Sequence, residues 1–126
     1  MKSREEKLAM ELIELIDKYK KDSEKAAAKD DEITEKFNYI KENSNDKDLI
    51  VIAIEEMAEL TQCLTKFLRK REVSNEEYNH LHEEFADVVV CMNHLINIFE
   101  FDEGEITERM LYKLDRTIER MKGKNK

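Results

Sequence analysis

The chain contains 126 residues, 30 of them acidic and 22 basic, so its formal net charge is −8. It has no Pro and only two Gly, which is too few for the tight turns of a β-sheet protein and leaves no room for a glycine-rich phosphate loop. The acidic balance argues against binding nucleic acid through its phosphates, because that contact needs a dense Lys and Arg surface. Length and composition therefore predict one all-α domain over residues 1–126.

The cysteines and the apolar runs bear on the compartment in which the chain works. Cys63 and Cys91 are its two thiols, and its charged start does not look like a secretory leader. This combination suits the reducing cytoplasm better than a disulfide framework. The longest apolar run, residues 49–54, is far shorter than the ~20 residues of a membrane span. We therefore expect a cytoplasmic protein that binds neither membrane nor nucleic acid.

The first 48 residues carry an interrupted amphipathic pattern. Apolar residues recur at helical spacing up to Tyr19, the stretch 20–31 is charged apart from three alanines, and the helical spacing then resumes. The pattern predicts either one bent helix or two helices in the segment 1–48, with an apolar face that belongs to a core or a subunit interface. The apolar positions are Leu8, Leu12, Leu15, Ile16, Tyr19, Ile33, Phe37 and Ile40.

Three further helices are predicted after a polar cluster. Residues 49–68 begin apolar on nearly every face, which marks a central helix. Residues 74–77 have the form of a capping box and open a helix that runs to about Phe101. We expect residues 102–104 to form the last turn, before a final helix with an apolar stripe that frays at Gly123. Short links between these helices predict a four-to-five-helix bundle.

Two groups of carboxylates stand inside otherwise apolar helices. Glu56 and Glu59 lie one helical turn apart on the central helix, and Glu84 and Asp87 repeat that spacing before the apolar run of the next helix. If the two helices pack antiparallel, four carboxylates converge, and such like charges repel or take up protons unless a cation lies between them. Oxygen ligands select a hard ion, so the pattern predicts a Mg²⁺ site for phosphate chemistry. The alternative is that these carboxylates are ordinary solvated helix positions.

The order of these carboxylates resembles the signature of the MazG-like nucleoside triphosphate pyrophosphohydrolases, an all-α family. The resemblance rests on Glu55-Glu56-x-x-Glu59, followed after 24 residues by Glu84-x-x-Asp87. It implies hydrolysis between the α- and β-phosphates of a ribo- or deoxyribonucleoside triphosphate, giving the monophosphate and pyrophosphate. It also implies that Glu56, Glu59, Glu84 and Asp87 bind Mg²⁺, with Mn²⁺ as a substitute, and that Glu55 orients or deprotonates the attacking water.

A basic face on the last predicted helix extends the resemblance, which covers residues 49–121. Lys113, Arg116 and Arg120 fall at spacings of 0, +3 and +7, a single face that could meet a triphosphate tail. Lys113 and Arg120 match positions at which the family contacts phosphate, whereas Thr117 stands where the family often has Asn. The alternative for this face is a solvated basic surface near a helix C-terminus. The resemblance implies a homodimer or homotetramer, and the apolar faces predict that the chain is not a monomer.

Further residues and other classes of protein stay open alternatives. His80 shares the helix face of Glu84, and His94 follows Asp87 by seven residues, so either could touch a base or a phosphate or be a polar side chain at the rim of the site. A di-iron carboxylate protein built on four helices would use two Glu-x-x-His motifs, of which Glu77-x-x-His80 supplies one. A non-catalytic helical interaction module, with its carboxylates facing solvent, is the third class.

Overall fold

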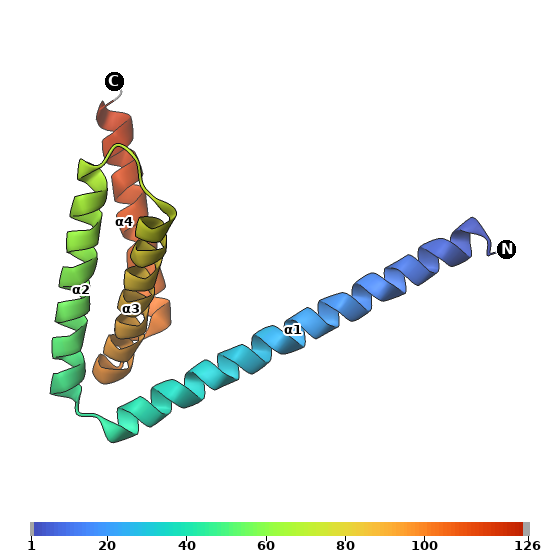
Figure 1. Cartoon of the computed structure of the whole chain (residues 1–126), viewed down its shortest axis with the longest axis horizontal. Coiled ribbons are helices and arrows are strands. Elements are labelled where there is room, and N and C mark those ends of the chain that lie inside the picture. The colour runs from blue at the N-terminus through green and yellow to red at the C-terminus, as the bar shows by residue number, and fades with distance from the viewer. Residues whose placement is uncertain (1, 125–126) are drawn as a thin grey trace. The chain divides into compact units, whose positions relative to one another are not determined.

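The structure is a computed structural model that describes residues 2–124. It contains four helices, α1 (Arg4–Asn43), α2 (Asp46–Arg69), α3 (Asn75–Phe99) and α4 (Glu103–Lys124), and the described residues form no strand (Figure 1). The predicted all-α class is thereby confirmed. The chain divides into two compact units, Met1–Asn43 and Ser44–Lys126. Among the described helices, none is both long and apolar enough to cross a bilayer.

The first unit consists of α1, which is one continuous helix. The sequence pattern is compatible with either one bent helix or two helices. The helix continues through the charged stretch because its three alanines are strong helix formers. Just beyond the stretch, Lys36 Nζ and Glu32 Oε1 form an ion pair at 2.7 Å, one helical turn apart. At the start of α1, Ser3 Oγ accepts a hydrogen bond from the Glu6 amide at 3.2 Å. None of the residues of α1, all of which the structure describes, is buried.

Asn45 fixes the start of α2. Its Oδ1 accepts a hydrogen bond from the Asp48 amide at 2.8 Å, and its side-chain amide donates to Asp48 Oδ2 at 2.9 Å. The helix is apolar where predicted, but its buried residues are Leu49 and Ala53, while Ile54 remains 59% exposed. Within one chain, α2 is therefore packed on one side and is not surrounded as a central helix would be.

The predicted capping box opens α3. Ser74 Oγ accepts a hydrogen bond from the Glu77 amide at 3.1 Å, which satisfies one of the amides that a helix start leaves without a partner. Lys70 Nζ, which follows α2, lies 2.7 Å from Glu77 Oε2. These contacts join the end of α2 to the beginning of α3.

The end of α3 differs from the prediction, since the helix stops at Phe99 and not near Phe101. Glu100 adopts a left-handed backbone conformation with φ 52°, and the amides of Glu100 and Phe101 both donate to the Ile96 carbonyl. The rings of Phe99 and Phe101 stack across this turn with their centroids 5.6 Å apart. The chain thus turns at Glu100, where the stacked rings support the turn, and not at Gly104.

Both glycines lie inside α4, contrary to expectation. Asp102 Oδ1 accepts a hydrogen bond from the Gly104 amide at 2.9 Å, and the Asp102 carbonyl accepts one from Ile106 at 3.0 Å. Asp102 therefore acts as the cap of α4, which places Gly104 in the first turn of the helix and not in the predicted turn. Gly123 also belongs to α4, so the helix does not fray there.

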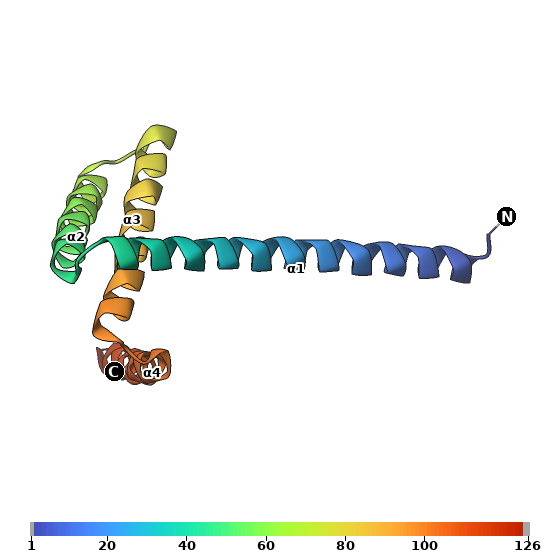
Figure 2. The ribbon, with the colours of Figure 1, turned by 90° about the horizontal axis from the view of Figure 1, so that it is seen from below.

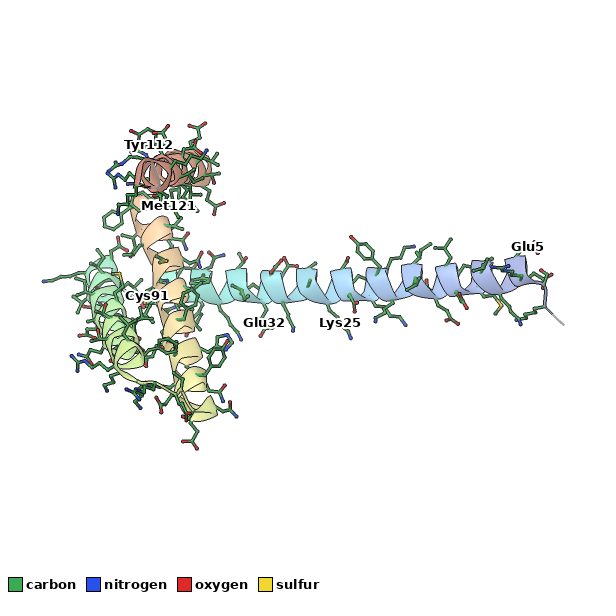
Figure 3. All side chains as sticks on the ribbon, turned by 90° about the horizontal axis from the view of Figure 1, so that it is seen from above. Glu5, Lys25, Glu32, Cys91, Tyr112 and Met121 are labelled. Carbon is green, nitrogen blue, oxygen red and sulfur yellow. The ribbon has the colours of Figure 1, made fainter. Side chains whose placement is uncertain are left out.

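The core of the second unit lies between α2 and α3, which pack as an antiparallel pair (Figure 1). Cys91 lies between the two helices in Figure 3. In Figure 2, α4 is seen end-on beyond the end of α3 and away from α2, and it has few contacts with either helix. The expected bundle is thus not closed within the second unit of one chain. The buried residues among those described are Leu49, Ala53, Val88, Cys91 and His94.

Candidate functional site

Four predicted carboxylates meet on the facing sides of α2 and α3. One carboxylate oxygen from each of Glu56, Glu84 and Asp87 lies within 4.8 Å of the other two. Glu59 lies close enough for its charge to act on both Glu56 and Glu84. The antiparallel packing brings these residues together because each pair is spaced by one turn and so occupies one side of its helix. We call these four residues the acidic cluster.

Burial is uneven within the acidic cluster. Glu56 and Glu84 are half-buried, with 13% of the Glu84 side chain exposed, whereas Glu59 and Asp87 are exposed. One oxygen of each half-buried carboxylate, Glu56 Oε2 and Glu84 Oε2, is buried without a hydrogen-bond partner. A buried charged oxygen without a partner destabilises the fold, since it has lost its hydration and gained nothing in exchange.

The pKa values of the two half-buried carboxyls are both raised, because burial and neighbouring negative charges disfavour their charged forms. Burial raises the pKa of Glu56 above its ordinary value, and the negative charges of Glu59, Asp87 and Glu84 raise it further. Burial also raises the pKa of Glu84, with Glu59 adding to the rise. His80, whose Nε2 lies 3.8 Å from Glu84 Oε1, partly opposes this rise. Proton uptake or cation binding would relieve the repulsion.

Two polar residues on the inner side of α3 stay neutral near pH 7. Cys91 is buried, and burial, together with the charges of Glu56 and Asp87, raises the pKa of its thiol. His94 is also buried and does not lie at the rim of a site, and burial lowers the pKa of its imidazole. A thiol carries no positive charge in either form, and the lowered pKa of His94 disfavours its cationic form, so neither residue balances the acidic cluster.

A cleft of about 340 Å³ opens beside the acidic cluster, between the end of α2 and the start of α3. Its lining combines Lys66, Lys70 and His80 with the carboxylates of Glu76 and Glu77 and with apolar surface that includes Phe67 and Leu81. Because His80 also contacts Glu84, the cleft and the acidic cluster are neighbours. The cleft therefore carries both signs of charge beside apolar surface, and Lys66 is its lysine that the Glu77 ion pair does not engage.

The two lysines of the cleft were absent from the residues that the sequence motif indicated. Lys66 follows Glu59 by seven residues and so lies on the side of α2 that carries the acidic cluster, and Lys70, four residues later, immediately follows the helix. This spacing is a signal that could identify Lys66 and Lys70 from the sequence. The motif pointed instead to basic residues near the end of the chain.

The other predicted site residues lie apart from the acidic cluster. Glu55 is exposed on α2 and is not one of the carboxylates whose oxygens lie within 4.8 Å of one another. Lys113, Arg116 and Arg120 are exposed on α4, which does not pack along the α2–α3 pair. A single chain therefore does not bring the basic face of α4 onto the acidic cluster.

The Glu77-x-x-His80 motif, which a di-iron site would use, is divided between two structural roles. Glu77 accepts hydrogen bonds at the start of α3, and its bond from Lys70 is the main reason that its pKa is lowered. His80 alone approaches the acidic cluster, through Glu84. Glu77 therefore stabilises the start of α3, and only His80 of this motif contacts the acidic cluster.

No protein-family model matches the chain, and comparisons with curated proteins and with solved structures likewise give no match. A function is therefore inferred from the acidic cluster and from the adjacent cleft, which carries both signs of charge and apolar surface.

Proposed function

We propose that the chain is a divalent-metal-dependent pyrophosphohydrolase that releases pyrophosphate from a ribo- or deoxyribonucleoside triphosphate. The observation that carries the proposal is the pair of buried oxygens, Glu56 Oε2 and Glu84 Oε2, without hydrogen-bond partners inside a cluster of like charge. A divalent cation would satisfy both oxygens and offset the repulsion between the carboxylates. The order of these carboxylates along the chain, which resembles the MazG-like signature, supports the same function.

The donor set fits Mg²⁺. Glu56, Glu59, Glu84 and Asp87 all offer oxygen atoms, which hard cations prefer, and Mn²⁺ accepts the same donors. Cys91 is a poor competing ligand because its raised pKa keeps the thiol protonated. When bound, Mg²⁺ would offset charge on the triphosphate and lower the pKa of a coordinated water.

The cleft beside the acidic cluster has the chemistry of a nucleotide-binding site. Lys66 and Lys70 offer positive charge for phosphate oxygens, and Phe67 offers apolar surface for a base. Because Lys70 is already bound to Glu77, we assign the larger part of phosphate binding to Lys66. Glu55, exposed beside the cluster in sequence, is proposed to orient or deprotonate the attacking water.

We also propose that the active form is a homodimer or homotetramer. Large apolar side chains are exposed on all three helices of the second unit, such as Ile54 (59%), Met92 (54%) and Leu114 (57%). Exposed apolar surfaces of this extent mark interfaces. A second copy that covered them would close the bundle, and it could carry Lys113, Arg116 and Arg120 of one α4 toward an acidic cluster, where they would contact phosphates.

The test is a panel of canonical and modified nucleoside triphosphates, assayed with Mg²⁺, with Mn²⁺ and with EDTA, in which pyrophosphate and orthophosphate are measured separately. We expect pyrophosphate from at least one nucleotide and none with EDTA. Glu84→Gln should abolish the release, whereas Glu83→Gln, which changes an exposed neighbour, should retain it.

The outcomes separate the proposal from its alternatives. If no nucleotide yields pyrophosphate with either metal, the proposed activity is wrong. Metal-dependent stabilisation without turnover would then indicate an interaction module that binds a cation, and bound iron with an oxo-iron absorption would indicate the di-iron class.

A further inference from the structure

We propose that α1 pairs with α1 of a second copy of the chain in an antiparallel arrangement centred close to Lys25 and Ala26. The pairing concerns the first unit and does not depend on the proposed hydrolase activity. Three features of α1 support it: an exposed apolar stripe, matched charges along one side of that stripe, and a length sufficient for a specific interface.

The apolar stripe of α1 is largely exposed. Leu12 and Leu15 are 58% and 64% exposed, Tyr19 is 74% exposed and Ile33 is 52% exposed. These residues follow each other at helical spacing on one face of a 40-residue helix. A stripe of this kind on a helix without a buried residue is typical of helices that pack on another helix.

The stripe is nearly symmetric about Ala26. Tyr19 precedes Ala26 by seven residues and Ile33 follows it by seven, while Leu12 precedes it by fourteen and Ile40 follows it by fourteen. In an antiparallel pair centred here, Tyr19 of each copy lies beside Ile33 of the other, and Leu12 lies beside Ile40. The small Ala26 side chains meet at the centre, where they allow the two helices to approach closely.

A row of charges along one side of the stripe fits the same arrangement. A two-fold axis perpendicular to the plane of two antiparallel helices sets each side of the stripe against the same side in the partner. Glu14 then lies opposite Lys36, Lys18 opposite Glu32 and Asp22 opposite Lys29, each pair occurring twice. Figure 3 shows Lys25 and Glu32 projecting from the same side of α1. The six charged residues that form these pairs are Glu14, Lys18, Asp22, Lys29, Glu32 and Lys36. Lys25, at the centre of the same side, faces Lys25 of the partner, a single like-charge contact against six opposite-charge contacts.

The same charges do not favour a parallel pair in register. In that arrangement the two-fold axis runs along the helices and sets the charged side of the stripe against its other side. The other side carries the uncharged Ser23, Ala27 and Thr34 together with two charges that offset each other. In a parallel pair Asp30 would face Lys25 of the partner favourably, and Lys41 would face Lys36 unfavourably. The opposite charges therefore select the antiparallel direction, as charges beside a helix–helix seam generally do.

The length of α1 sets the strength of the pairing. With this centre, residues 8–43 of the two copies overlap over about 50 Å of helix, and a contact about 10 Å wide buries about 1,000 Å² in total. This area lies at the lower limit for a specific interface. We therefore expect an association that is weak and that salt weakens further, because the flanking charges are exposed to solvent.

Disulfide formation in the full chain tests the face and the direction of the pairing. In a Cys63→Ser, Cys91→Ala background, Ala26→Cys places a thiol at the centre of the stripe and Ala28→Cys places the same change on the other side of α1. Ala26→Cys should form a covalent dimer at least tenfold faster than Ala28→Cys. Leu12→Cys should be as slow as Ala28→Cys, because antiparallel copies hold these sites about 40 Å apart.

Two results of this experiment would overturn the proposal. Equal rates for Ala26→Cys and Ala28→Cys would mean that the stripe does not face another copy, whether it stands in solvent or binds a different protein. Fast dimer formation by Leu12→Cys would mean that the helices pair in parallel.

A charge exchange in the chain with its native cysteines provides a second test. Lys18→Glu and Glu32→Lys should each weaken association measured by sedimentation at low salt by about threefold to tenfold, because each puts like charges opposite each other twice. The double variant should recover the native association constant, and Glu35→Lys, which shares with Ala28 the face away from the stripe, should leave it unchanged. A double variant as weak as the single variants, or four indistinguishable variants, would contradict the pairing.

Discussion

Glu56 on α2 and Glu84 on α3 bring carboxylate oxygens within 4.8 Å of each other, and each also holds a buried oxygen without a hydrogen-bond partner. Two like charges in this position destabilise the metal-free chain and favour a cation between the helices. This relationship has consequences for stability that can be measured before any substrate is known.

Replacing Asp87 by Asn should abolish pyrophosphate release without unfolding the chain. The amide removes one negative charge at nearly constant shape, so the metal-free variant should be as stable as the native chain or more stable. The native chain should gain melting temperature with Mg²⁺, since a ligand that binds only the folded state stabilises it, and the variant should gain much less. Glu83→Gln is the matched control, and a native metal response in Asp87→Asn would show that the site is misplaced.

The free energy of unfolding of the metal-free chain should contain a contribution that falls as pH rises. The pKa values of Glu56 and Glu84 are raised above 4.5, so the folded chain binds more protons than the unfolded chain between the ordinary and the raised values. This contribution is favourable below the ordinary pKa and is lost as pH rises through the raised pKa. Urea titrations in EDTA between about pH 4 and 7 measure it, and Glu84→Gln should flatten the pH dependence. Identical pH profiles for the two chains would contradict the raised pKa of Glu84.

Replacing Lys66 by Ala should raise KM for the nucleotide by about tenfold, with a smaller effect on kcat, because the lost charge–phosphate contact contributes about 1.4 kcal/mol to binding. Lys47→Ala, which changes an exposed lysine at the other end of α2, is the control. An unchanged KM in Lys66→Ala together with a raised KM in Arg116→Ala would assign phosphate binding to α4.

Replacing Ala53 by Leu should destabilise the α2–α3 pair by about 1–3 kcal/mol, because the added atoms must displace packed neighbours. Ala53 is 1% exposed, whereas Ala58 on the same helix is exposed, so Ala58→Leu is the matched control. Urea unfolding followed by circular dichroism compares the two variants. Equal stabilities would mean that the two helices can separate at little cost.

The parts of the structure that the sequence predicts are those encoded by residues one turn apart. Ser74 and Glu77 are close in the chain, so their hydrogen bond and the start of α3 follow from local chemistry. The acidic cluster also follows, because Glu56 and Asp87 each belong to a one-turn pair and the short link between their helices enforces antiparallel packing.

Two parts of the structure are not predicted from the sequence. One is the turn between α3 and α4, where several residues could end or begin a helix, and the other is which surface covers the apolar stripe of α4. Gly104 can form a turn, but Asp102 caps a helix at that point, and Glu100 takes the left-handed conformation instead. The apolar stripe of α4, which includes Leu114, shows that the helix has a face to cover but not which helix covers it.

The core between α2 and α3 is sparse, and this bears on how the stability of the chain depends on its concentration. The buried apolar residues among those described, Leu49, Ala53, Val88 and Cys91, are too few to offset the conformational entropy lost by ordering long helices. The association proposed above would supply part of the free energy of folding, and the fraction of folded chains would then depend on total protein concentration by mass action. Dilution would act on this protein as a denaturant, and its melting temperature would rise with the logarithm of its concentration.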